Sequence, residues 1–231
     1  MDRSKVAVVI PALNEERTIV AVAANVHGFG VAIVVDDGST DRTGEWAAQA
    51  GAVVVRHERN RGYDAALNSG FARAQELGFE VAITVDADGQ HDPALASAFL
   101  AAIDAGADVV LGVRDRHQRL AETLFALAGR WKLGLRDPLC GMKAYQMSVY
   151  RALGHFDSYG SIGTELAIFA ARHGYRLTQL PLITQDRIGE SRFGRRFSAN
   201  RRILRALWLG LFSRPSGPGQ ARKPHVDLKC T

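Results

Sequence analysis

Val81-Ala82-Ile83-Thr84-Val85-Asp86-Ala87-Asp88 is the stretch that decides the fold, because an apolar run ends there in two carboxylates one residue apart. A short apolar run of this kind predicts a buried strand, and open α/β sheets bind their ligands at the carboxyl ends of the strands. An earlier apolar run at residues 31–35 ends in the same way, in Asp36-Asp37-Gly38-Ser39. The repetition predicts a site for a nucleotide and a metal ion at one edge of a sheet.

Short β-rich runs alternate with longer, helix-like segments. This alternation predicts an α/β fold with a Rossmann-like, mostly parallel central sheet flanked by helices. Helix starts are expected at 14–16 and 39–41, where short polar and acidic side chains can cap free amides, and at Asp92-Pro93. Further helices are expected near 117–134 and 163–173. The expected strands lie near residues 5–10, 31–35, 52–56, 80–85 and 108–113.

The composition suits a single domain with an appended tail. The chain has 231 residues, of which 47% are hydrophobic, and its formal charge is +5. We expect a domain over 1–194, a basic amphipathic helix over 195–213 and a disordered tail over 214–231. Two cysteines, Cys140 and Cys230, are too few for a disulfide framework or a four-ligand zinc site, which favours a reducing, cytoplasmic setting. No segment reaches the roughly 18 uninterrupted apolar residues of a membrane span.

The two strand-end motifs suggest specific chemistry. Asp86 and Asp88 can supply hard oxygen ligands to Mg²⁺ or Mn²⁺, and such a cation bridges a diphosphate. Asp36-Asp37-Gly38-Ser39 can hydrogen-bond a base and a ribose. Each motif also has a purely structural explanation, because both fit a solvated turn with a helix cap. The position of both motifs after buried strands favours the ligand site.

Four motifs occur in order along the chain: Val9-Ile10-Pro11-Ala12-Leu13-Asn14-Glu15, Val35-Asp36-Asp37-Gly38-Ser39-Thr40-Asp41, Asn60-Arg61-Gly62 with Asn68-Ser69-Gly70, and Asp86-Ala87-Asp88-Gly89-Gln90-His91. As a set they resemble glycosyltransferase family 2, of GT-A fold, over roughly residues 5 to 195. Two later motifs are similar to its dolichol-phosphate mannose synthase and polyprenyl-phosphate glycosyltransferase subgroup. These are Asp137-x-x-Cys140-Gly141-Met142-Lys143 and Arg187-Ile188-Gly189-Glu190-Ser191-Arg192.

The resemblance implies a role for each matching residue. Asp86, Asp88 and Gln90 are expected to bind Mg²⁺ or Mn²⁺ and the diphosphate. Arg114 and Arg187 are expected to meet phosphates of the donor or the acceptor. The nucleotide-sugar pocket is expected to include Pro11, Leu13, Asn14, Glu15, Val35, Asp37, Gly62, Asp86, Ala87 and Asp88.

The chain departs from the family pattern in three places. Leu13 stands where relatives often carry an aromatic residue for base stacking. The transmembrane helices that many relatives append are absent from the sequence. The Gln-x-x-Arg-Trp signature of processive polysaccharide synthases is also absent after residue 165, which argues against a polymerising role.

The expected reaction is transfer of one sugar from a GDP- or UDP-linked donor, with inversion at the anomeric carbon. A polyprenyl phosphate acceptor is largely dianionic at neutral pH, because its second pKa is about 6, and it therefore needs no protein base. A sugar hydroxyl acceptor would need a carboxylate base, for which Asp137 and Glu165 are the candidates. Each of these acids also fits a structural role, as a loop acid or a helix-start acid.

The segment 195–213 favours the lipid acceptor, because arginines with Trp208 and Phe212 suit an anionic membrane surface. Packing of its apolar face on the domain is the alternative. The protein is thus expected to be cytoplasmic and peripheral to the membrane. A sugar nucleotidyltransferase is disfavoured because the loop after the first strand, 11–17, is acidic and lacks glycine. Nucleic acid is not expected as a partner, because no recognisable binding motif is present.

Overall fold

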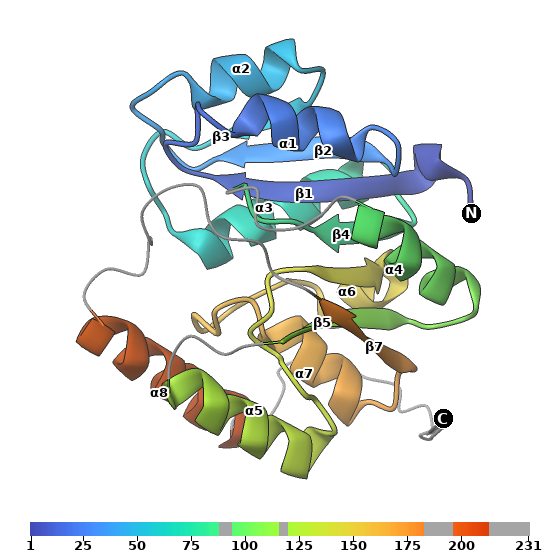
Figure 1. Ribbon diagram of the computed structural model, residues 1–231, viewed down its shortest axis with the longest axis vertical. Helices are drawn as coiled ribbons and strands as arrows, with labels where there is room; N and C mark the ends of the chain where they lie inside the picture. The colour runs from blue at the N-terminus through green and yellow to red at the C-terminus, as the bar shows by residue number, and fades with distance from the viewer. Residues whose placement is uncertain (88–93, 116–119, 183–195, 213–231) are drawn as a thin grey trace.

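The computed structural model describes residues 1–87, 94–115, 120–182 and 196–212 of the chain (Figure 1). Its strands are β1 (Val6–Ala12), β2 (Val31–Asp36), β3 (Val53–Arg56), β4 (Val81–Thr84), β5 (Val109–Arg114), β6 (Lys143–Gln146) and β7 (Leu177–Leu182). They form a single sheet with the order β3-β2-β1-β4-β6-β5-β7. The sheet is mostly parallel, and only β6 runs antiparallel to its neighbours β4 and β5. The predicted α/β class is confirmed.

Helices cover both faces of the sheet (Figure 1). They are α1 (Ile19–Val26), α2 (Thr43–Gln49), α3 (Tyr63–Glu76), α4 (Ala94–Asp104), α5 (Leu120–Leu133), α6 (Met147–Leu153), α7 (Glu165–Arg172) and α8 (Arg196–Phe212), preceded by a short 3-10 turn at Arg3–Lys5. Alternating residues of each strand supply two separate cores. Ala7 and Val9 of β1 face the core shared with α3 and α5 to α8, whereas Val8 and Ile10 face the core beneath α1, α2 and α4.

The five expected strands are present, and two further strands were not predicted. β6 has only four residues and includes Lys143 and Gln146, so it has no apolar run to reveal it. β7 is a half-buried edge strand that carries Thr178, Gln179 and Pro181, and its pattern is correspondingly weak. The antiparallel β6 is what places the loop 137–142 beside the end of β4.

Two of the predicted helix starts are displaced. α1 begins at Ile19 and α2 at Thr43, three and two residues after the polar segments that were expected to cap them. Only Asp41 caps as expected, because its Oδ1 accepts from Thr43 N at 3.0 Å. Asn14 has a left-handed backbone, with φ of 52°, which a helix cannot accommodate. The polar side chains of the two segments bond each other instead: Asn14 N donates to Ser39 Oγ, and Thr40 N donates to Asn14 Oδ1. The start expected at Asp92-Pro93 lies outside the described residues.

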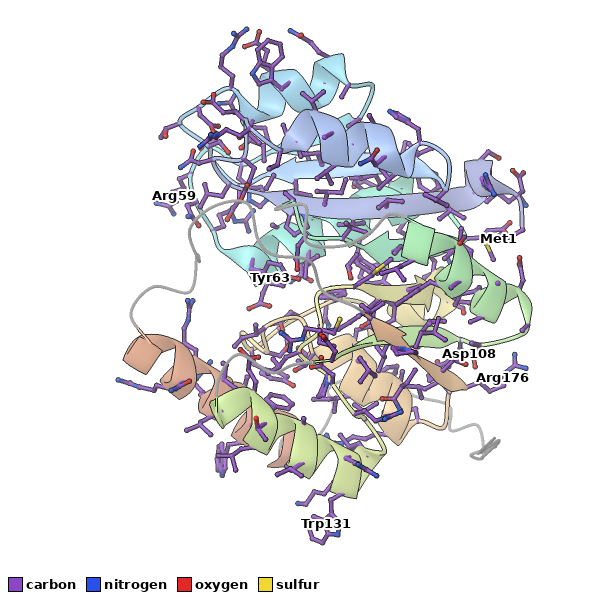
Figure 2. All side chains as sticks on the ribbon, viewed as in Figure 1. Met1, Arg59, Tyr63, Asp108, Trp131 and Arg176 are labelled. Atoms are coloured by element: carbon purple, nitrogen blue, oxygen red, sulfur yellow. The ribbon has the colours of Figure 1, made fainter. Side chains whose placement is uncertain are left out.

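The predicted carboxyl-terminal helix is present as α8, which lies beside α5 at the end of the molecule farthest from α2 (Figure 1). Its inward face is buried on the domain through Ile203, Ala206 and Gly210. Other side chains of the two helices project outward, and Figure 2 shows Trp131 of α5 at the tip of this end. No helix within the described ranges is long and apolar enough to cross a membrane. The expected tail over 214–231 lies outside the described residues.

Candidate active site

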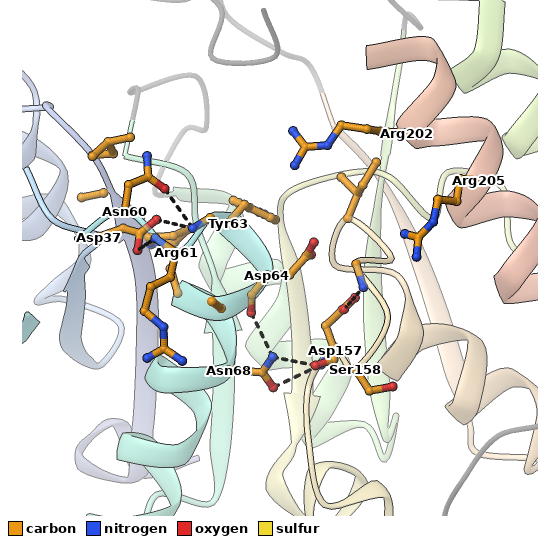
Figure 3. A pocket seen from close by; sticks show the side chains of 18 residues that line it. Asp37, Asn60, Arg61, Tyr63, Asp64, Asn68, Asp157, Ser158, Arg202 and Arg205 are labelled. Atoms are coloured by element: carbon orange, nitrogen blue, oxygen red, sulfur yellow. Dashed lines mark hydrogen bonds between the residues drawn. The ribbon is translucent and has the colours of Figure 1, made fainter. Parts of the chain in front are cut away.

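A cavity of about 580 Å³ opens between the carboxyl edge of the first strands and the second half of the chain (Figure 3). One wall comes from the loop after β1, from Asp37 and from the segment that begins α3. The other wall comes from the loop 157–162 and from α8. Of the predicted pocket residues, Pro11, Leu13, Asp37 and Gly62 line this cavity. The two halves of the fold thus enclose one site.

Asp37 is held in place before any ligand arrives. Its Oδ1 accepts a hydrogen bond from Arg61 N at 2.8 Å, and its Oδ2 accepts one from Gly62 N at 2.7 Å. The ring of His57 lies behind it, with Nδ1 2.6 Å from Asp37 Oδ1 and Nε2 2.8 Å from Ser69 Oγ. Since His57 is buried, this chain of contacts fixes both the carboxylate and the loop 60–62. The sequence did not predict a role for His57, because this residue belongs to none of the motifs.

Asp36 and Val35 do not reach the cavity. Asp36 is fully buried and turned beneath α2, where its Oδ1 accepts from Ser39 N and a Cβ on Gly44 would lie 2.5 Å from Oδ2. Val35 is also fully buried, inside the sheet, and is not among the residues that line the cavity. The period of two along a strand turns Asp36 away from the side that Asp37 faces, and Val35 lies two residues before Asp37, inside the sheet.

Asn14 and Glu15 brace the edge beside the cavity. Besides the contacts of Asn14 with the segment 39–40, Glu15 N donates to Thr43 Oγ1 at 2.7 Å, and Thr18 Oγ1 donates to Glu15 Oε2 at 3.1 Å. Neither residue lines the cavity. The structure therefore places these two predicted pocket residues at the junction between the loops that follow β1 and β2.

Asp86 lies just beyond β4 and is half-buried. Tyr63 Oη donates to its Oδ1 at 3.4 Å, so α3 approaches the acid from the cavity side. Ala87 is buried, and its carbonyl accepts from Thr18 Oγ1 at 2.7 Å, which ties the strand end to α1. Asp88 and Gln90 lie outside the described residues. No group of three or more His, Cys, Asp or Glu side chains converges within the described ranges.

The loop 137–142 passes directly against Asp86. A Cβ on Gly141 would lie 2.1 Å from Asp86 Oδ2, so any larger residue there would displace the Asp86 carboxylate. Thr84 Oγ1 donates to Gly141 O at 2.6 Å and accepts from Lys143 N at 3.1 Å, which fixes the loop to β4. The later motif that was singled out by sequence is therefore part of the same site as the strand-end acids.

Arg114 and Asp137 form a buried pair. The guanidinium donates from Nε to Asp137 Oδ2 at 2.8 Å and from Nη2 to Oδ1 at 2.9 Å, and Glu122 lies 3.4 Å from Nη1. Burial alone would lower the pKa of Arg114, but the hydrogen bonds and charge of Asp137 outweigh burial and raise it. Both predicted catalytic residues are thus engaged with each other. Arg187 lies outside the described residues.

Two buried groups, Cys140 and Lys143, lie in or next to the loop 137–142. Burial, and then the charge of Asp137, raise the pKa of Cys140 to about 12, so its thiol is a buried neutral group. Lys143 is buried and donates from Nζ to Gly163 O, and its burial lowers its pKa to about 8.

Glu165, the other candidate base, is buried at the start of α7. It accepts from Ser158 N at 2.6 Å, and His155 Nε2 lies 3.0 Å from its Oε1.

The far wall contains residues that sequence reasoning missed. Asp157 lines the cavity there and faces Asp64, which lies on α3 and was also missed; burial, followed by the charge of Asp157, raises the pKa of Asp64 to about 6. Arg202 and Arg205 of α8 line the same wall (Figure 3). Their positions depend on how α8 docks on the domain, and no local motif indicates that.

The sheet is mostly parallel and carries acids at its strand ends, and the second half of the chain closes the cavity beside them. This arrangement is typical of enzymes that bind nucleotide-linked substrates. Residues 7–161 match Glycosyl transferase family 2, and the chain belongs to this family. It is a glycosyltransferase, and its architecture is the GT-A fold that the sequence predicted.

Named relatives agree with the family. The chain is 31% identical to the polyprenol monophosphomannose synthase of Mycolicibacterium smegmatis, over 80% of this chain and 79% of that protein. It is 30% identical to the dolichyl-phosphate hexose transferase of Haloferax volcanii, over 80% and 85%. A similar solved structure is glucosyl-3-phosphoglycerate synthase from Mycobacterium tuberculosis in complex with Mn²⁺, UDP and phosphoglyceric acid. Its TM-score is 0.75 at 25% identity, and the match covers 95% of this chain and 82% of that one.

Proposed function

We propose that the protein transfers one sugar from a GDP- or UDP-linked donor to a polyprenyl phosphate, with inversion at the anomeric carbon. The observation that carries the proposal is the cavity itself, which joins a nucleotide-type strand edge to a wall that bears arginines on α8. The relatives named for polyprenol and dolichyl phosphate support the acceptor class.

The donor half supplies fixed groups for the nucleotide. The Asp37 carboxylate and the amides of the loop 60–62 are already ordered at one end of the cavity, which lowers the cost of binding a base and ribose. Leu13 lines the same end and offers apolar contact in place of an aromatic face.

The residues beside Asp86 fit a divalent cation. The acid is half-buried, Gly141 leaves it space that a side chain would fill, and carboxylate oxygen is the ligand type that Mg²⁺ and Mn²⁺ prefer. Asp86, with Asp88 and Gln90, would hold the ion, which when bound stabilises the charge of the departing diphosphate. A similar enzyme was solved with Mn²⁺ and UDP. Tyr63 orients Asp86 from the cavity side through its hydroxyl.

The state of the two candidate bases favours a phosphate acceptor. Asp137 is engaged by Arg114, and Glu165 is engaged by Ser158 and His155. A phosphate monoester needs no base, because it is already nucleophilic at neutral pH. Attack by a phosphate oxygen on the anomeric carbon breaks the bond to the diphosphate, which leaves as the nucleoside diphosphate.

Transfer to a hydroxyl is the second candidate, and the similar structure with phosphoglyceric acid favours it. In that case Glu165 or Asp137 would act as the base, and it would have to give up a hydrogen bond to the protein in order to accept the proton of the acceptor hydroxyl.

Association with an anionic membrane surface is part of the proposal. α5 and α8 lie side by side, and each exposes an apolar stripe at helical spacing. The exposed side chains are Leu124 (53%), Leu127 (60%) and Trp131 (83%) on α5, and Leu204 (44%) and Trp208 (62%) on α8. Exposed Arg130 and Lys132 supply positive charge nearby. Amphipathic, basic helices with tryptophan are typical of interfacial helices, and this placement makes the protein peripheral.

An acceptor assay tests the proposal. Purified protein is incubated with Mn²⁺ and with GDP- or UDP-linked labelled sugars, and it receives either polyprenyl phosphate in detergent or 3-phosphoglycerate. We expect label in the organic phase only with the lipid, and we expect loss of transfer in Asp86→Ala. A water-soluble labelled product with 3-phosphoglycerate, and none with the lipid, would establish the second candidate instead.

A further inference from the structure

Arg202 lies on the face of α8 that borders the cavity. The buried residues Ile203, Ala206 and Gly210 fix the orientation of the helix, because they pack on the domain. Arg202 and Arg205 then reach the edge of that packed face and line the cavity. Figure 3 shows the Arg202 side chain extending from α8 toward the side of the cavity that holds Tyr63.

The charge of Arg202 has no counterpart among the described residues. Arg205 donates from Nη1 to Tyr159 O at 2.9 Å, and Arg114 is engaged by Asp137. Within the described ranges, Arg202 makes no hydrogen bond or ion pair. Figure 3 shows Arg61, the other cavity arginine, directed away from α8. Of the two α8 arginines that line the cavity in the described part of the chain, Arg202 is therefore the one whose guanidinium is open to a ligand.

Two acids that line the cavity, Asp157 on the far wall and Asp64 on α3, are turned to backbone amides. Asp157 accepts from Gly160 N at 2.7 Å and from Ser161 N at 2.8 Å. Asp64 accepts from Gly163 N at 2.7 Å. Because both carboxylates are bonded to backbone amides, an anion beside Arg202 meets a guanidinium whose donors are still available.

We propose that Arg202 binds the phosphate of the acceptor and holds it across the cavity from the nucleotide. This inference rests on the proposed function, and it adds a binding residue outside every motif that was singled out by sequence. A guanidinium offers paired donors that match two oxygens of a phosphate monoester. A lipid phosphate and a soluble phosphate ester share this chemistry.

The position on α8 also connects the phosphate to the outer surface. The same helix exposes Leu204 and Trp208, two and six residues further along the chain. At about 100° per residue, these two side chains lie on another side of α8 from Arg202, so a prenyl chain whose phosphate is held at Arg202 would have to pass around the helix to reach the apolar stripe. One helix would then hold the head of the acceptor and border its tail.

The test compares Arg202→Gln with Arg201→Gln. Arg201 is the matched control, because it is an exposed arginine on the same helix that does not line the cavity. A short-chain, water-soluble prenyl phosphate serves as the acceptor, so that binding of the protein to a bilayer does not enter the measurement. We expect Arg202→Gln to raise the KM for the prenyl phosphate about 10- to 100-fold and to leave the KM for the donor unchanged. We expect Arg202→Lys to recover part of the loss and Arg201→Gln to match the wild type.

The outcomes distinguish the role of Arg202 from the proposed function. Equal acceptor KM values for the Arg202 and Arg201 variants, with active wild-type protein, would overturn the role of Arg202 and leave the proposed function intact. A rise in the donor KM of the same size as the acceptor KM would also overturn it. If the wild type transfers to no prenyl phosphate but does transfer to 3-phosphoglycerate, the lipid acceptor is wrong, and the same KM comparison with 3-phosphoglycerate decides the role of Arg202. Inactivity with both acceptors would overturn both proposals.

Discussion

Gly141 shows how a single residue can set the position of Asp86, the acid that we propose binds the cation. A methyl group there would lie 2.1 Å from Asp86 Oδ2, and the cheapest relief is rotation of the Asp86 side chain. We therefore expect Gly141→Ala to keep a melting temperature near that of the wild type and to lose Mn²⁺-dependent nucleotide binding, measured by titration calorimetry. Gly28→Ala is the control, because no atom lies within 4 Å of its added Cβ. Unchanged nucleotide affinity in Gly141→Ala would show that Asp86 does not contribute.

Asp64 predicts a pH dependence of stability. Its pKa is raised from 3.8 to about 6, so the folded state favours the protonated form. Its contribution to stability is complete below about pH 4 and is lost as the pH rises through about 6. Asp64→Asn keeps an acceptor for Gly163 N and cannot ionise. We expect its advantage over the wild type, in the free energy of unfolding, to grow by about 2 kcal/mol between about pH 4.5 and pH 7.5.

Urea denaturation across this pH range measures the effect. Exposed Glu58→Gln is the control for the removal of a surface carboxylate. A constant difference between Asp64→Asn and the wild type at every pH would mean that Asp64 titrates alike in the folded and unfolded states.

At the scale of elements, α5 is predicted to contact lipid together with α8. Leu127 and Trp131 are exposed by 60% and 83% on adjacent turns of α5, so replacing both with serine removes apolar area without opening a core. We expect the double variant to lose about tenfold or more in binding to anionic vesicles, at unchanged melting temperature. Val20→Ser with Leu77→Ser is the matched control, because these side chains are exposed but lie on other parts of the surface. Equal co-sedimentation of both double variants would exclude α5 from the interface.

The elements that could be predicted from sequence are those with a strong local signal. Apolar runs predicted β1 to β5, and the alternation with helices predicted the sheet class. The helices begin three and two residues after the polar segments 14–16 and 39–41, because polar groups of these segments bond across the gap between two loops. β6 stayed hidden because its four residues depend on pairing with β4 and β5, which sequence periodicity does not report.

The residues of the site also divide into those with a local sequence signal and those that depend on long-range packing. The strand-end motif predicted Asp37, because strand ends converge on one edge in any parallel sheet, and the family resemblance supplied Gly62; both line the cavity, whereas Asp86 lies at the end of β4 outside its lining. The residues that face each other across the cavity could not be predicted, because Asp64, Asp157 and Arg202 come together only when β6 reverses direction and α8 packs on α5 and α7. Long-range packing, rather than local spacing, brings these residues to the cavity.

At the scale of the whole molecule, the cavity lies between two halves, so a ligand that bridges them should stabilise the entire fold. A ligand that binds only the native state adds about 2.7 kcal/mol at a concentration 100 times its Kd. We expect UDP or GDP with Mn²⁺ to raise the melting temperature, and each nucleotide without metal to raise it less, because the diphosphate carries charge that Asp86 alone repels. Asp86→Ala should lose the metal-dependent part, and exposed Glu76→Gln should retain it. The nucleotide that gives the larger shift identifies the base of the donor. A shift that is independent of metal, or that persists in Asp86→Ala, would remove the divalent cation from the proposed mechanism and leave the diphosphate to the arginines of the cavity.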